Sequence, residues 1–146
     1  MKTIKTIKLL IESGEDLAIE TTFSGKTLEK HIDIARQNGY IVYIIFLVLR
    51  SAELSMIRVT QRALLGRHYV SLERISNRYD RSLNNFFNIY KEYADFWVIA
   101  DNSTLDVKVL YWGGNIFYKQ KKVFCLTSEI NYITKFIDIN QQSNID

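Results

Sequence analysis

Apolar residues recur along the chain with two spacings, and helical segments alternate with short continuous apolar runs. The first segment has helical spacing, over Ile4, Ile7, Leu10 and Ile11, and a cap-like Gly14 ends it. The run LAIE then predicts a strand that ends at Glu20, and a helix over about 27–38 follows, with Gly39 as its stop. Alternation of this kind is typical of an α/β fold.

The longest apolar run, YIVYIIFLVL over 40–49, is apolar on both faces and rich in Ile, Val and Tyr. A run of this type predicts a central strand of a parallel sheet that is covered on both sides. Ser51 is a suitable N-cap for the next helix, which Gly66 ends. A long amphipathic helix is expected over about 71–94.

The last third of the chain predicts β-structure followed by a short helix. FWVIAD is a strand that runs into the turn-prone DNS, and VKVLYWGGNIFYK, with its Gly-Gly break, predicts a C-terminal β-hairpin. A helix is expected over about 129–137, and the polar residues 140–146 form a tail. With no proline and no linker-like stretch, 1–139 is expected to form one domain.

Composition restricts the class of protein. The chain has 146 residues, of which 47% are hydrophobic, which is enough for one core. A net charge of +3 does not by itself favour a nucleic-acid partner. The longest apolar run is half the length of a membrane span and no secretory signal is evident, so a cytoplasmic protein without a membrane partner is expected. Cys125 is the single cysteine and suits a buried, reduced position.

The stretch ETTFSGKT, residues 20–27, ends like a nucleotide-binding P-loop. The complete pattern, G-x-x-x-x-G-K-[ST], requires glycine where Glu20 stands. A carboxylate there would repel phosphate and remove the backbone freedom that the loop needs, so the P-loop interpretation is rejected.

Glu20 nevertheless lies where ligands gather in parallel α/β sheets, beyond the carboxyl end of a strand. Thr21, Thr22 and Ser24 place hydroxyls beside its carboxylate, which suits a hydroxylated ligand. The alternative is that these hydroxyls only cap the next helix. The residues alone leave both interpretations open.

Arginines are concentrated in one part of the chain. Six of the eight fall between positions 58 and 81, with Arg58 and Arg62 on one expected helix and Arg74, Arg78 and Arg81 on one face of the next. Guanidinium groups converging from two helices suit a polyanion such as a nucleotide triphosphate. A solvated face, partly neutralised by acidic neighbours, is the alternative.

Metal sites and familiar catalytic sets are not indicated. His31 and His68 lie far apart without other ligands at suitable spacing, and no Ser-His-Asp or Cys-His arrangement can be argued. His31 is interpreted as a surface residue and His68 as a hydrogen-bonding loop residue. We therefore assign no catalytic and no metal-binding residue from the sequence.

Three stretches together resemble the zeta-toxin-like P-loop kinases, in particular their compact bacterial group. They are ETTFSGKT, then residues 38–70 from NGYIVYIIF to GRHYV, then residues 74–103 from RISNRYD to IADNS. The motifs occur in the family's order, over about 7–103. The family's Gly-Gly-His reads Gly66-Arg67-His68 here, which adds a charge.

The resemblance implies a fold and a set of roles. Zeta toxins use ATP and Mg²⁺ to phosphorylate a UDP-linked N-acetylamino sugar. Glu20, with Thr21 and Thr22, would position the acceptor. Arginines at the family's lid positions, Arg58, Arg62, Arg78 and Arg81, would steady the ATP phosphates. Asp101 and Asn102 match the DNS motif, to which we assign no role here.

The family's P-loop and its catalytic base precede the first helix seen here. We therefore expect an incomplete P-loop-kinase-like parallel sheet, N-terminally truncated, which holds ATP and Mg²⁺ weakly and is inactive alone. The absent first strand would expose a neighbouring strand edge. An N-terminal complementing fragment, an antitoxin and a UDP-sugar-like molecule are the expected partners. A non-catalytic partner-binding module is the alternative.

Overall fold

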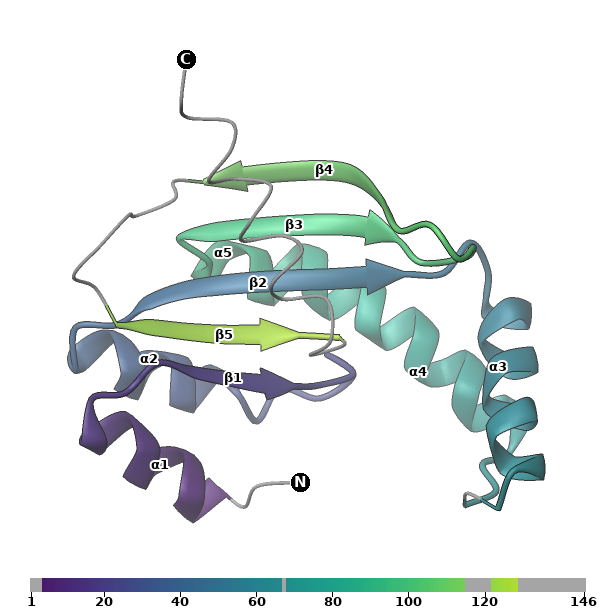
Figure 1. Ribbon diagram of the computed structural model, residues 1–146, viewed down its shortest axis with the longest axis horizontal. Coiled ribbons are helices and arrows are strands. Elements are labelled where there is room, and N and C mark those ends of the chain that lie inside the picture. The colour runs from purple at the N-terminus through teal and green to yellow at the C-terminus, as the bar shows by residue number, and fades with distance from the viewer. Residues whose placement is uncertain (1–3, 67, 115–121, 129–146) are drawn as a thin grey trace.

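A mostly parallel five-stranded sheet, with helices packed on one face, forms the body of the protein (Figure 1). The computed structural model describes residues 4–66, 68–114 and 122–128. In chain order the elements are α1 (Ile4–Ser13), β1 (Leu17–Glu20), α2 (Glu29–Gln37), β2 (Ile41–Val48), α3 (Ala52–Leu64), α4 (Leu72–Asn85), a π-helical turn (Phe86–Tyr90), α5 (Lys91–Tyr93), β3 (Phe96–Asp101), β4 (Lys108–Gly114) and β5 (Val123–Thr127). This confirms the expected α/β class.

The strands follow the order β1-β5-β2-β3-β4, and β4 alone among them runs antiparallel to its neighbour. The described strand that is last in sequence, β5, lies between β1 and β2. Cys125 shows this position, since it is in register with Ala18 on one side and Tyr43 on the other. The outer strands of the described sheet are β1 and β4, and β5 fills the position between β1 and β2.

Strand β2 is the central strand that its composition predicts. Residues 41–46 are all buried, and their side chains alternate between two apolar clusters. Val42, Ile44 and Phe46 join the cluster that includes residues of α1, α2 and the π-helical turn. Helices pack on this face because the alternation of a strand places every second side chain there.

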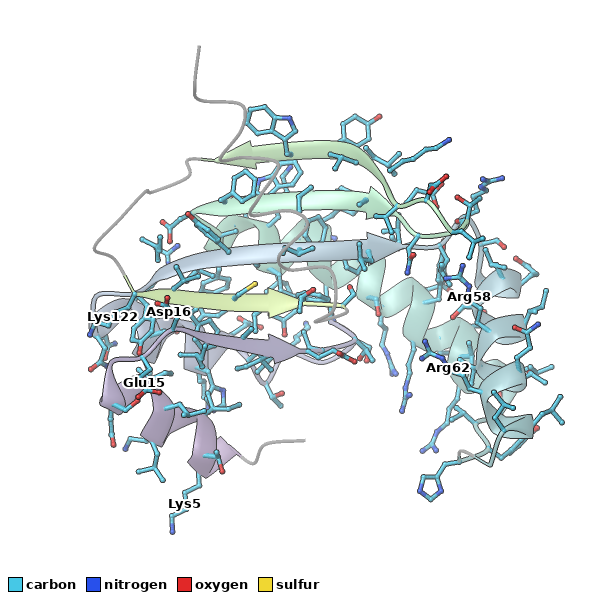
Figure 2. All side chains as sticks on the ribbon, viewed as in Figure 1. Lys5, Glu15, Asp16, Arg58, Arg62 and Lys122 are labelled. Carbon is cyan, nitrogen blue, oxygen red and sulfur yellow. The ribbon has the colours of Figure 1, made fainter. Side chains whose placement is uncertain are left out.

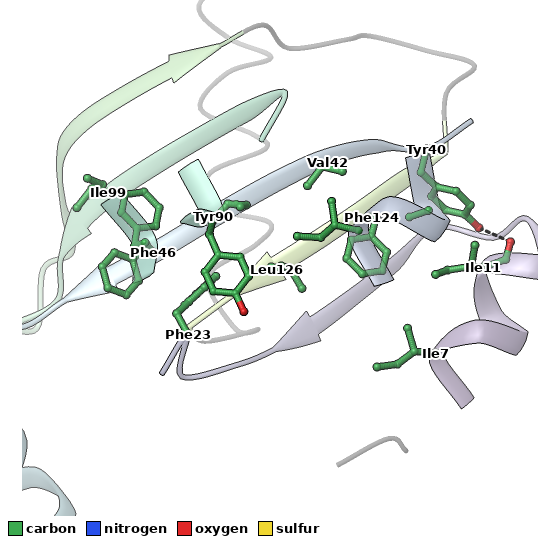
Figure 3. Packing of buried hydrophobic residues seen from close by; sticks show 14 residues of the cluster. Ile7, Ile11, Phe23, Tyr40, Val42, Phe46, Tyr90, Ile99, Phe124 and Leu126 are labelled. Atoms are coloured by element: carbon green, nitrogen blue, oxygen red, sulfur yellow. Dashed lines mark hydrogen bonds between the residues drawn. The ribbon is translucent and has the colours of Figure 1, made fainter. Parts of the chain in front are cut away.

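An aromatic group ties the π-helical turn to the sheet (Figure 3). The rings of Phe46 and Phe86 stack with centroids 4.6 Å apart, and Phe23 meets the rings of Phe46 and Tyr90 edge-on at 5.3 Å. Phe23, Phe86 and Tyr90 are fully buried. Edge-on and offset contacts add to the free energy gained by burial.

Serine side chains cap α3 and α4, which confirms the expected N-cap Ser51 and adds Ser71 as a second one. Ser51 Oγ accepts a hydrogen bond from Leu54 N at 3.2 Å, and Ser71 Oγ accepts one from Arg74 N at 3.4 Å. The long helix expected over 71–94 is present as α4, the π-helical turn and α5 in succession. The helix expected over 129–137 and the tail at 140–146 lie outside the described residues.

The C-terminal antiparallel pair is present one strand earlier than expected, since β4 pairs with β3. Gly113 and Gly114 are the last two residues of β4. A Cβ on Gly113 would come within 2.8 Å of the Trp97 ring, and one on Gly114 within 2.1 Å of Asp95 O. Both glycines therefore allow β4 to approach the start of β3 closely, while residues 115–121 are outside the described part of the chain.

Burial of β5 predicts a large effect of a single truncation. Replacing Phe124, which is fully buried between β1 and β2, with alanine should lower the free energy of unfolding by about 3–5 kcal/mol. Leu105→Ala, at a fully exposed position, should change it by less than about 0.5 kcal/mol. Urea unfolding measures both, and a loss under about 1 kcal/mol for Phe124→Ala would contradict the placement of β5.

Candidate functional site

A cavity of about 250 Å³ opens at the carboxyl ends of β1, β2 and β5, the position that the sequence analysis favours for a ligand. Thr21 and Thr22 follow β1, Ser128 follows β5, and residues 46–49 complete the sheet side. Helices α3 and α4 form the other wall. Most of the lining is apolar, and its polar groups are hydroxyls and one guanidinium, that of Arg78.

Three side chains of α4 and the π-helical turn hold the loop that follows β1. Asn85 Nδ2 donates to Phe23 O at 2.9 Å, and the hydroxyl of Tyr90 donates to Gly25 O at 2.6 Å. Ser82 Oγ lies 2.5 Å from Thr22 O and 2.7 Å from Arg78 O, and its one proton is shared between these two carbonyl oxygens. The three contacts direct the carbonyl groups of Thr22, Phe23 and Gly25 toward the helix and hold the two threonines at the cavity.

Phe23 carries the conformational strain of this loop. Its φ is +58°, in the left-handed region that residues other than glycine rarely adopt. Its ring is fully buried among Phe46, Phe86 and Tyr90. Because these contacts and the bond from Asn85 fix the residue from both ends, the strained backbone persists, and such strain is often stored beside functional sites.

The amides of this loop are directed toward its own threonines. Phe23 N donates to Thr21 Oγ1 at 3.2 Å, and Ser24 N donates to Thr22 Oγ1 at 3.4 Å. A phosphate cradle needs these N–H groups to point at the ligand. The N–H groups of Phe23 and Ser24 are therefore engaged within the loop itself.

Helix α2 does not use these hydroxyls as caps. Its N-cap is Leu28, which makes no side-chain cap hydrogen bond. The interpretation of Thr21, Thr22 and Ser24 as caps of the next helix is therefore wrong, because the residues instead form short turns with their own backbone.

Two of the three predicted acceptor residues lie at the cavity. Thr21 and Thr22 line the cavity. Glu20, the last residue of β1, is exposed, stands opposite Thr127 of β5 in the sheet register and is outside the lining of this cavity. The carboxylate is thus one residue away from the cavity wall along the chain.

The four predicted phosphate-binding arginines lie on the two helices of the cavity wall. Arg78 lines the cavity directly, and Arg81 lies one turn further along α4. Arg58 and Arg62 are on α3, on the side toward the sheet and α4 (Figure 2). Ion pairs between described residues join Lys8 to Glu12, Arg36 to Asp95 and Arg50 to Asp101, so none of the four predicted arginines is paired there.

Tyr79 joins α4 to the end of β2. Its hydroxyl donates to Leu49 O at 2.6 Å. Burial raises the pKa of Tyr79, and the charges of Asp80, Glu53 and Asp101 raise it further. The phenol therefore stays protonated at neutral pH and keeps its role as a donor.

The DNS motif, 101–103, joins the ends of β2 and β3. Asp101 Oδ1 accepts a hydrogen bond from Ser103 N at 2.8 Å, and Ser103 Oγ accepts one from Arg50 N at 2.8 Å. Asn102 N donates to Val48 O at 2.8 Å. Hydrogen bonds from Ser103 hold the pKa of Asp101 below its ordinary value, so its carboxylate is charged at neutral pH.

His31 and Cys125, two further side chains considered in the sequence, are buried. His31 is buried, with Nδ1 3.2 Å from Thr27 O, so its interpretation as a surface residue is wrong. It turns inward because α2 directs His31, Ile32 and Ala35 toward the core. Cys125 is buried as expected, and burial raises the pKa of its thiol to about 12. Within the described ranges, no three His, Cys, Asp or Glu side chains gather as a metal site.

The sequence analysis missed Ser82, Asn85 and Tyr90, which hold the loop after β1. A polar residue inside the apolar stripe of a helix was the available signal, because Asn85 lies between positions that are buried. A buried amide requires a partner. The identity of that partner, a carbonyl 62 residues away, is not readable from local spacing.

Comparison with known proteins identifies one relationship. A family model described as zeta toxin matches residues 3–112. Searches of curated proteins and of solved structures gave no match. Among the described residues, no helix has both the length and the apolar character that crossing a bilayer requires.

The loop contacts predict different effects for two neighbouring asparagines. Asn85→Ala removes the donor to the carbonyl of Phe23 and should lower the free energy of unfolding by about 1–3 kcal/mol. Asn88→Ala removes an exposed bond to Asn84 O and should cost less than about 0.5 kcal/mol. Thermal or urea unfolding compares them, and equal effects would show that Asn85 does not hold the loop.

Proposed function

Because the chain belongs to the zeta toxin family, we propose that its cavity is the acceptor side of a phosphotransferase site. The ligand would be hydroxylated and phosphate-bearing, of the UDP-N-acetylamino sugar type. The observation that carries the proposal is the meeting of Thr21, Thr22 and Arg78 on one cavity. Threonine hydroxyls suit the hydroxyls of a sugar, and a guanidinium suits a phosphate because its donors match two phosphate oxygens.

The neighbouring arginines extend this site toward a second set of phosphates. Phosphoryl transfer needs positioned reactants and a protein that neutralises charge on the transferred group. Arg58 and Arg62 on α3, with Arg81 on α4, flank the cavity and lack carboxylate partners among the described residues. We assign them to nucleotide phosphates, and Glu20 to the acceptor hydroxyl.

Family membership makes ATP and Mg²⁺ the expected cofactors, yet the residues present do not fit their principal contacts. The loop that resembles a P-loop directs the N–H groups of Phe23 and Ser24 toward threonine hydroxyls. The printed sequence has no G-x-x-x-x-G-K-[ST] match elsewhere. Without that loop neither the phosphates nor Mg²⁺ has its usual holder.

We therefore infer that this polypeptide binds an acceptor but does not transfer phosphate by itself. An ATP-binding part would come from another segment, such as an N-terminal complementing fragment. An antitoxin is a further partner that the family suggests. On this proposal the polypeptide is a remnant or separated part of a kinase.

Arg78 provides the sharpest test of acceptor binding. Arg78→Gln should weaken the affinity for UDP-N-acetylglucosamine about 10- to 100-fold, since a charge-assisted hydrogen bond to phosphate is lost. Arg74→Gln, one turn away on α4 and outside the cavity lining, should change affinity less than about twofold. Isothermal titration calorimetry measures both affinities. Equal losses of affinity in the two variants would show that the ligand does not bind in this cavity.

Phosphate transfer is the second test. The purified chain with Mg-ATP and UDP-N-acetylglucosamine should yield no phosphorylated sugar, because the contacts that hold ATP are lacking. Mass spectrometry of the sugar nucleotide detects the product. Turnover that Glu20→Gln abolishes would overturn the inference that the chain is inactive alone.

A non-catalytic partner-binding module is the second candidate, and the surface of β4 favours it. Val109, Leu110, Tyr111 and Trp112 are 44–67% exposed on a strand with one open edge among the described residues. Exposed apolar edge strands are sites at which other chains add a strand. A protein of this class should bind neither UDP-sugars nor nucleotides, so the calorimetric experiment separates the two candidates.

A further inference from the structure

Helix α3 is weakly held by the core although it forms part of the cavity wall. None of its 13 residues is buried, whereas α2 buries three residues in nine. Ser55 and Val59 of α3 nonetheless line the cavity. Helix α3 packs along α4 through half-buried side chains, so its direction also depends on how its first residues are fixed.

The connection between β2 and α3, residues 49–51, is fixed from two sides. The DNS residues, Asp101 to Ser103, hold one side through the bonds Asn102 N to Val48 O and Arg50 N to Ser103 Oγ. Tyr79 of α4 holds the other side through Leu49 O. Ser51, the next residue, caps α3 directly, so any rotation here is passed to the helix.

The charge of Asp101 reinforces this arrangement. Its Oδ2 lies 3.8 Å from Arg50 Nε, and its Oδ1 accepts the N–H of Ser103. The carboxylate therefore orients the serine whose hydroxyl receives the N–H of Arg50. The three residues 101–103 act together as a clasp on the base of α3.

We propose that the 101–103 clasp positions α3 at the cavity, and that Asp101 and Ser103 are positioning residues for ligand binding. They act on the ligand through the connection at 48–50, where Val48 and Leu49 line the cavity, and through α3, which carries Ser55 and Val59. The link to ligand affinity rests on the function proposed above. The claim that the clasp fixes the direction of α3 is independent of that function.

The direction of α3 can be measured without a ligand. Spin labels on Gln61→Cys of α3 and Lys30→Cys of α2, in a Cys125→Ala background, report the distance between the helix and the body of the protein. Double electron–electron resonance should give one narrow distribution for the parent, which Ser103→Ala broadens about twofold or more, since one of the bonds to residues 48–50 is lost. Ser103→Thr, which keeps a hydroxyl, should restore the narrow distribution.

Ser13→Ala is the matched control. It also removes one side-chain bond to the backbone, from Ser13 Oγ to Leu10 O at 2.7 Å, but at the end of α1. Its distribution should equal that of the parent. If Ser103→Ala does not fold, Tyr79→Phe tests the opposite side of the same connection and should broaden the distribution in the same way.

The second part of the experiment measures the affinity for UDP-N-acetylglucosamine. Ser103→Ala should weaken it about 3- to 10-fold, as expected for one lost hydrogen bond, while Ser103→Thr and Ser13→Ala leave it unchanged. The clasp would be overturned if the parent binds UDP-N-acetylglucosamine and Ser103→Ala keeps both the distance distribution and the affinity of the parent. A broadened distribution in a protein that binds no UDP-sugar would retain the clasp and refute the proposed function.

Discussion

The pairing of β5 with both β1 and β2 is the interaction on which the rest of the structure depends. Among the described strands, β1 pairs with β5 alone, so without β5 the strand that leads into Thr21 and Thr22 has no place in the sheet. Residues 123–127 lie outside the stretch 3–112 that matches the zeta toxin family. The position between β1 and β2 is thus filled by a segment that the family match does not include.

Two further sets of contacts convert that sheet into a cavity. Ser82, Asn85 and Tyr90 draw the carbonyl groups of the loop after β1 toward α4 and the π-helical turn, while the buried ring of Phe23 holds the loop in a strained conformation. Across the opening, bonds from 101–103 and from Tyr79 fix the base of α3. Hydroxyl groups and the guanidinium of Arg78 therefore line one cavity from separate elements.

Local patterns predicted the elements that local physics determines. The apolar run at 40–49, the N-cap Ser51 and the clustering of arginines on two helices were all readable from the sequence. Long-range pairing was not, because nothing local shows that VFCLT enters between β1 and β2 or that Gly113 and Gly114 accommodate Trp97 and Asp95. His31 was misread for the same reason, since its burial depends on the packing of α2.

Amide and methyl chemical shifts under titration with UDP-N-acetylglucosamine test the central claim most directly, because they locate the ligand as well as detecting it. The account predicts saturable changes at Thr21, Thr22, Val48, Leu49 and Arg78, around the cavity. Changes confined to β4, or no saturable change at millimolar ligand, would contradict an acceptor site at the carboxyl ends of β1, β2 and β5.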